Sequence, residues 1–131
     1  MVLEPGELVA FVPVGDAARA TTFYTEVLGC ALDGADDYGA MLTFGATRIR
    51  LAQVDGWAPP AHTVLGFVVP TVAAAVGDLT GAGVELFRYD GMVQDELGIW
   101  VAPSGDRVAW FADSEGNTLS LTQEGEWNLA G

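Results

Sequence analysis

The sequence has 131 residues, half of them hydrophobic, which suits a single small domain with its own core. Eighteen acidic residues against five basic ones give a net charge of −13, which excludes the basic surface that nucleic-acid binding requires. The lone Cys30 excludes an internal disulfide, and no apolar run reaches the length of a membrane span. Because the first residues also lack the basic start of a signal peptide, we expect a cytoplasmic protein.

The first half of the chain predicts a strand, a helix and a hairpin. Residues 8–14 are β-branched and aromatic, as in a buried strand. Asp16 is a suitable helix N-cap, and Gly29 a suitable stop. Between them, four apolar residues fall at helical spacing on one face: Ala20, Phe23, Tyr24 and Val27. Residues 38–44 and 47–53 then flank Gly45-Ala46, which predicts a tight hairpin.

The second half repeats this pattern. Residues 64–69 predict a strand and Thr71 the N-cap of a helix, whose apolar face comprises Val72, Ala75, Val76 and Leu79. Further strands are predicted at 84–88, 99–102, 108–112 and 118–122. Repetition within one short chain indicates an internal duplication. We therefore predict an α+β protein with one βαβββ module at about 7–53, a linker at about 54–61, a second module at about 62–123 and a tail at 124–131.

Two motifs at the expected separation connect this pattern to a known family. The first is Asp16, then the pair Phe23-Tyr24, then Val27-Leu28-Gly29; the second is the tract at 110–117, WFADSEGN. Together they resemble the signatures of the glyoxalase/bleomycin resistance/extradiol dioxygenase (vicinal oxygen chelate) superfamily. The second tract departs from the usual F-x-D-P-D-G-N at Ser114-Glu115 and keeps Gly116 for a turn with positive φ. The resemblance implies two βαβββ modules that form a curved mixed sheet around a cleft.

The resemblance also locates the four positions that hold a divalent metal ion in metal-using relatives. These positions are Val9, Arg50, Val64 and Ser120. Valine has no donor atom, arginine repels a cation and a lone serine hydroxyl is a poor ligand. We therefore expect no metal ion and no other cofactor.

Other side chains are expected to line the cleft instead. Strand alternation places Arg48 on the same face as Arg50, and Trp110 on the face opposite its neighbour Phe111. The arginines are suited to an anionic group of a ligand, or they pair with local acidic residues. Trp100 and Trp110 are suited to a planar or apolar ligand, or they belong to the core or to a dimer interface.

His62 is the one histidine of the chain, and histidine is the side chain that most often serves as a general base. It lies two residues before Val64, so alternation places it on the same face, near the rim of the cleft. There it is a candidate general base, and its alternative role is that of a solvated residue after Pro59-Pro60-Ala61.

These features favour a protein that binds a small molecule without a metal ion, as a homodimer and with neither nucleic acid nor a membrane as partner. In the drug-sequestering branch of the superfamily, acidic proteins bind cationic glycopeptide antibiotics, which agrees with the charge of −13. The acidity is equally that of a solvated surface. The alternative function is that of a lyase, isomerase or dioxygenase-like enzyme, with Arg50 as electrophile and His62 as base.

Overall fold

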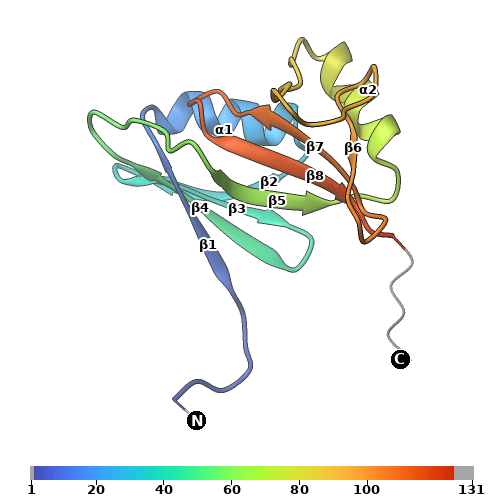
Figure 1. The fold of residues 1–131 in the computed structure, drawn as a ribbon. Coiled ribbons are helices and arrows are strands. Elements are labelled where there is room, and N and C mark those ends of the chain that lie inside the picture. Colours follow the sequence, from blue (N-terminus) through green and yellow to red (C-terminus); the bar gives the residue numbers. More distant parts are fainter. Residues whose placement is uncertain (1, 126–131) are drawn as a thin grey trace. The chain divides into compact units, whose positions relative to one another are not determined.

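The computed structural model describes residues 2–125 and divides the chain into two compact units, with the boundary between Pro59 and Pro60. This boundary lies in the linker predicted at 54–61. Each unit contains one four-stranded mixed sheet and one helix of ten residues (Figure 1). Of the predicted tail, residues 126–131 lie outside the described residues. In the described part of the chain, no helix has the length and apolar character needed to cross a membrane.

The first unit has the strand order β1-β4-β3-β2, in which β1 runs parallel to β4 and the other pairs are antiparallel. Its elements are β1 (Val9–Val14), α1 (Ala17–Glu26), β2 (Ala31–Asp36), β3 (Gly39–Phe44) and β4 (Thr47–Gln53). The sequence pattern predicted all of them except β2. All six residues of β2 are exposed, so the strand carries no alternation of apolar and polar residues. It forms as an edge strand through its ladder with β3.

Helix α1 covers one face of the first sheet and contacts β2, β3 and β4. As predicted, Asp16 is the N-cap, and its carboxylate accepts a hydrogen bond from the Arg19 N–H at 3.0 Å. The core between helix and sheet consists of fully buried or nearly buried apolar side chains: Val12, Val14, Ala20, Tyr24, Ala40, Leu42, Ile49 and Leu51. In β1 and β4 these residues alternate with more exposed ones, so one face of the sheet is packed and the other is open.

The second unit repeats this arrangement with the strand order β5-β8-β7-β6. Its elements are β5 (Thr63–Val68), α2 (Val72–Gly81), β6 (Trp100–Val101), β7 (Arg107–Ala112) and β8 (Thr118–Gln123). The strand predicted at 84–88 is wrong. This segment makes only an isolated bridge between Leu86 and Phe111, together with one hydrogen bond from the Phe87 N–H to the Trp110 carbonyl at 2.7 Å. The strand predicted at 99–102 is reduced to the two residues of β6.

Helix α2 packs on β7 and β8 through a second apolar core: Phe67, Val72, Val76, Leu79, Ala109, Phe111, Leu119 and Leu121. One irregularity lies in β5. The ladder passes from Thr63, opposite Thr118, directly to Leu65, opposite Leu119, so Val64 is the extra residue of a β-bulge. Alternation along β5 is therefore interrupted before Leu65.

The two helices begin in the same way. The Gln53 side chain, at the end of β4, accepts a hydrogen bond from the Ala17 N–H at 2.8 Å. The Gln123 side chain, at the end of β8, accepts one from the Val72 N–H at 3.0 Å. Thr71 occupies the predicted N-cap position of α2, but its side chain makes no capping hydrogen bond. The glutamine of the last strand therefore ties the first helical N–H to the sheet in each unit.

Candidate functional site

The candidate site residues lie on the faces of the two sheets that the helices leave uncovered. In the first unit, Phe11, Met41, Arg48 and Arg50 share this face, and we call them the arginine face. In the second unit, Trp100, Trp110 and Ser120 share it through the pairs Trp100–Val108 and Trp110–Ser120. With Tyr89, whose ring contacts Trp110, we call these the aromatic face. Each face belongs to one unit.

Arg50 makes the main ion pair of the arginine face. Its guanidinium lies 2.9 Å from an Asp36 carboxylate oxygen and donates a second hydrogen bond to the other oxygen at 3.2 Å. The Asp36 carboxylate also accepts the Tyr38 N–H at 2.8 Å. The Tyr38 N–H and then the Arg50 guanidinium hold the pKa of Asp36 below its usual value, because both stabilise the charged carboxylate. One guanidinium nitrogen of Arg50 thus contacts both carboxylate oxygens of Asp36.

Arg48 is held more loosely. Its nearest carboxylate oxygen, on Glu7, is 3.9 Å away, and both side chains are partly exposed. The neighbouring residues Ile49 and Leu51 lie in the core, at 1% and 0% exposure, so alternation separates the arginines from them. Of the two roles weighed for the arginines, the structure displays pairing with carboxylates, which at this exposure still leaves donors for a ligand.

Three rings pack against one another on the aromatic face. Trp100 and Trp110 have ring centroids 6.1 Å apart with planes tilted by 35°, and Tyr89 meets Trp110 edge to face at 5.5 Å. Phe111, one residue from Trp110, is fully buried on the helix side. Burial raises the pKa of the Tyr89 hydroxyl above its usual value, so Tyr89 is a neutral hydrogen-bond donor at neutral pH. The face offers π surface with few charges.

Two aromatic residues of these faces were absent from the sequence prediction. Phe11 lies opposite Arg50 in the ladder and is 69% exposed. Its position two residues after Val9 on the same strand was the signal that would have found it. Tyr89 lies in a loop outside the strands, and its ring contacts that of Trp110. No local sequence pattern indicates this contact.

The positions expected to hold a metal ion in relatives are only partly aligned with one another. In the first unit Val9 lies opposite Arg48, and Phe11 opposite Arg50. In the second unit Gly66, two residues after Val64, lies opposite Ser120, as Phe11, two residues after Val9, lies opposite Arg50. None of these side chains supplies a carboxylate, imidazole or thiolate. Among the described residues, no three His, Cys, Asp or Glu side chains lie close enough together to hold a metal ion. These donors do not fit a divalent cation.

His62 is exposed and precedes the first residue of β5. The alternation that placed it on the face of Val64 does not extend to it, since the strand begins at Thr63 and bulges at Val64. The place of His62 on this face therefore stays a prediction, and its exposure agrees with the solvated alternative.

The residues of the second signature build a turn. One Asp113 carboxylate oxygen accepts the Glu115 and Asn117 N–H groups at 2.8 and 2.9 Å, and the other accepts the Asn117 side-chain amide at 3.1 Å. Gly116 has a φ of +83°, as the turn requires. This motif joins β7 to β8. Asp113 and Asn117 are buried, so their side chains are not exposed on the open face.

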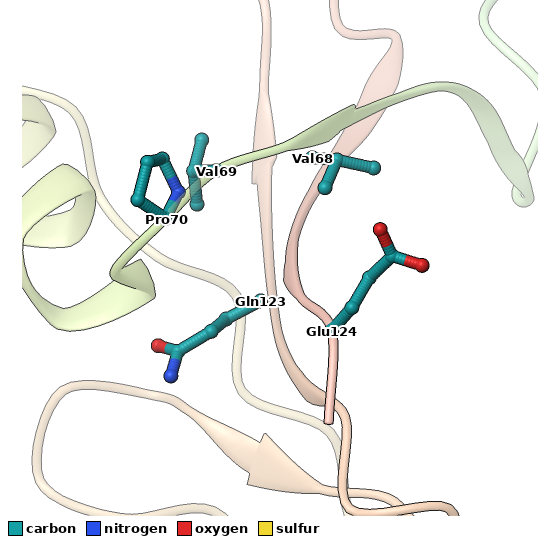
Figure 2. A pocket seen from close by; sticks show the side chains of 5 residues that line it. All are labelled: Val68, Val69, Pro70, Gln123 and Glu124. Carbon is teal, nitrogen blue, oxygen red and sulfur yellow. The ribbon is translucent and has the colours of Figure 1, made fainter. Parts of the chain in front are cut away.

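Figure 2 shows an open pocket of about 370 Å³ where β5 and β8 end. It is lined by Val68, Val69, Pro70, Gln123 and Glu124. The Gln123 amide oxygen is already engaged at the start of α2, which leaves the Glu124 carboxylate as the one charged group of the lining. This pocket contains none of the predicted site residues.

Comparison with known proteins supports the fold. No curated protein sequence matches the chain. A superfamily member from Sphaerobacter thermophilus has a similar structure, with a TM-score of 0.71, 21% identity and coverage of 92% of this chain and 98% of that one. The bleomycin resistance determinant of transposon Tn5 has a TM-score of 0.72 and 18% identity, and the match covers 93% of this chain and 100% of that one. A member from Alicyclobacillus acidocaldarius has a TM-score of 0.68 and 15% identity, and the match covers 96% of each chain.

The sequence itself matches one family model, described as the Glyoxalase/Bleomycin resistance protein/Dioxygenase superfamily, over residues 7–121. This range includes β1 and the first four residues of β8, and hence both modules. The chain belongs to the glyoxalase/bleomycin resistance protein/dioxygenase superfamily.

Proposed function

We propose that the protein binds a small organic molecule through the open face of its second sheet, without a resident metal ion or other cofactor, and that its task is sequestration rather than catalysis. The observation that carries this proposal is the aromatic face, where Trp100, Trp110 and Tyr89 present ring surfaces. Such surfaces bind planar or apolar groups. A cytoplasmic homodimer is the form that we propose for the protein.

An antibiotic of the bleomycin type is the proposed ligand. The similar structure from Tn5 is that of a bleomycin resistance determinant, and a net charge of −13 attracts a cationic drug at long range. The enzyme alternative is less well supported. His62 is exposed, and Arg50 pairs with Asp36 through one guanidinium nitrogen, so their surroundings within residues 2–125 do not favour a base or an electrophile over a binding role.

The experiment is a titration of the purified protein with bleomycin, followed by tryptophan fluorescence. We expect a saturable change in the wild type and binding weaker by about tenfold or more in Trp110→Phe and Trp100→Phe, given the usual contribution of a central aromatic side chain. Trp57→Phe is the matched control, because Trp57 lies after β4 and before β5, outside the strands that form the two faces. No change at high micromolar drug would exclude this ligand.

Metal content tests the other half of the proposal. Protein purified without chelator should contain far less than one equivalent of Zn, Ni, Mn or Fe. The four positions that bind the metal ion in relatives hold residues without a strong metal ligand: Val9, Arg50, Val64 and Ser120. One tightly bound equivalent would contradict a metal-free site, whatever the outcome of the drug titration.

A further inference from the structure

A second pocket lies at the edge of the sheet of the second unit, beside β6. Its volume is about 360 Å³, and its lining comprises Val93, Gln94, Asp95, Ile99, Trp100, Val101 and Arg107. All of these residues belong to the second unit.

Arg107 differs from the other basic residues of the chain, all of which are arginines. Arg48 and Arg50 pair with carboxylates, and the Arg88 guanidinium donates to the backbone carbonyls of 95 and 96. Arg19 also has a polar or electrostatic contact within the described residues. Arg107 is exposed, and within residues 2–125 its guanidinium makes no hydrogen bond or ion pair. A guanidinium left unpaired in so acidic a chain is available to a carboxylate.

Asp95 supplies the opposite charge in the same pocket. One of its carboxylate oxygens accepts the Leu97 and Ile99 N–H groups, both at 2.9 Å, which orients the side chain. The second oxygen remains for a ligand. The neighbouring Gln94 is already engaged, since its amide bonds the backbone of Phe87, Tyr89 and Gly98. The pocket therefore presents one guanidinium and one carboxylate, which are not close enough to form an ion pair with each other.

The rest of the pocket wall is apolar. Trp100 provides an aromatic surface, and Val93 and Val101 are 88% and 53% exposed. Exposed apolar side chains next to two charges suit a ligand with an apolar body and a polar head.

We propose that this pocket binds a zwitterionic small molecule with an aromatic or branched apolar side chain, in the manner of a free amino acid. Its carboxylate would pair with Arg107, its ammonium with Asp95, and its side chain would pack on Trp100 and the valines. A simple anion is repelled by Asp95 and by the net charge of −13, and a simple cation is repelled by Arg107. A zwitterion can place its negative group at Arg107 and its positive group at Asp95, so neither repulsion opposes its binding. This site shares Trp100 with the aromatic face but does not rest on the proposed function, because it is argued from Arg107 and Asp95.

The experiment is a calorimetric titration with L-phenylalanine, with phenylacetate and phenethylamine as analogues that lack one charge each. We expect saturable binding of L-phenylalanine, and binding about tenfold weaker or more for either analogue, given the strength of a charge-assisted hydrogen bond. The Trp100 indole N–H resonance should shift during the titration. Absence of binding at millimolar L-phenylalanine, or equal affinity for either analogue, would overturn the proposal.

Two variants locate the site. Arg107→Gln and Asp95→Asn should each weaken L-phenylalanine binding about tenfold or more, and Asp95→Asn keeps an oxygen that can accept the turn hydrogen bonds. Arg19→Gln removes the same charge from the first unit and should bind as the wild type does. Unchanged affinity in Arg107→Gln would refute the assignment, provided that thermal unfolding shows each variant folded.

Discussion

The two units of the molecule have similar packed faces and different open faces. In each unit, a ten-residue helix packs on buried aliphatic residues of the sheet, and a glutamine of the last strand holds the first helical N–H. The open face of the first unit carries two arginines and their carboxylates, whereas that of the second carries tryptophans and a tyrosine. The two units thus share the packing that folds each of them and differ in the side chains that their open faces carry.

The similarity of the packed faces predicts the largest effects. Leu51 and Leu121 occupy corresponding positions in β4 and β8 and are 0% and 5% exposed. Leu51→Ala and Leu121→Ala should each lower the free energy of unfolding by about 2–5 kcal/mol, because each leaves a cavity in its core. Urea unfolding measures this. Phe11→Ala, on the open face, is the control and should change stability far less; a loss below about 1 kcal/mol for either leucine would contradict equivalent cores.

The contrast between the open faces is sharpest at Phe11 and Gly66, which lie opposite Arg50 and Ser120. A Cβ added at Gly66 would lie 2.8 Å from the Ser120 hydroxyl oxygen. Gly66→Ala should therefore destabilise the protein by about 1–3 kcal/mol through overpacking. The double variant with Ser120→Ala should recover most of this loss, because the clashing oxygen is gone. If the double variant shows simple additivity, the two residues are not in contact.

A smaller, pH-dependent effect belongs to the arginine face alone. The pKa of Asp36 is lowered in the folded state, first by the Tyr38 N–H and then by Arg50. The stabilisation is present above the unfolded-state pKa of Asp36 and is lost as the pH falls through the lower folded-state value. Arg50→Gln should raise this pKa only in part, since the Tyr38 hydrogen bond remains. Carboxyl NMR titration of the two proteins measures it, and an unchanged pKa in the variant would mean that the ion pair does not form in solution.

The sequence predicted the elements whose signal is local. Asp16, the apolar stripes of both helices and the glycine turns follow from periodicity and capping, and they gave both helices within a few residues. Strand β2 was missed because its residues are exposed and its stability comes from the ladder with β3. Residues 84–88 look like a strand by composition, but no partner ladder forms along them.

The site residues show the same division. The separation of Arg48 and Arg50 from Ile49 and Leu51 follows from the two-residue period of a strand. The partner of Arg50 was not predictable, because Asp36 lies on the strand that the pattern failed to show. The bulge at Val64 interrupts the alternation of β5 before Leu65, and a one-residue insertion of this kind has no signature in the sequence.

The glutamines at the ends of β4 and β8 have a consequence for how the chain tolerates interruption. Each amide closes the helix of its own unit, across 36 residues in the first and 51 in the second, and neither hydrogen bond crosses the boundary between Pro59 and Pro60. Cleavage of the backbone at that boundary would leave both helix starts anchored. Each repeat thus holds its own helix start without the other. The segment between Gln53 and Thr63 is therefore the place where we expect the chain to tolerate a backbone cut, an insertion or a new pair of termini.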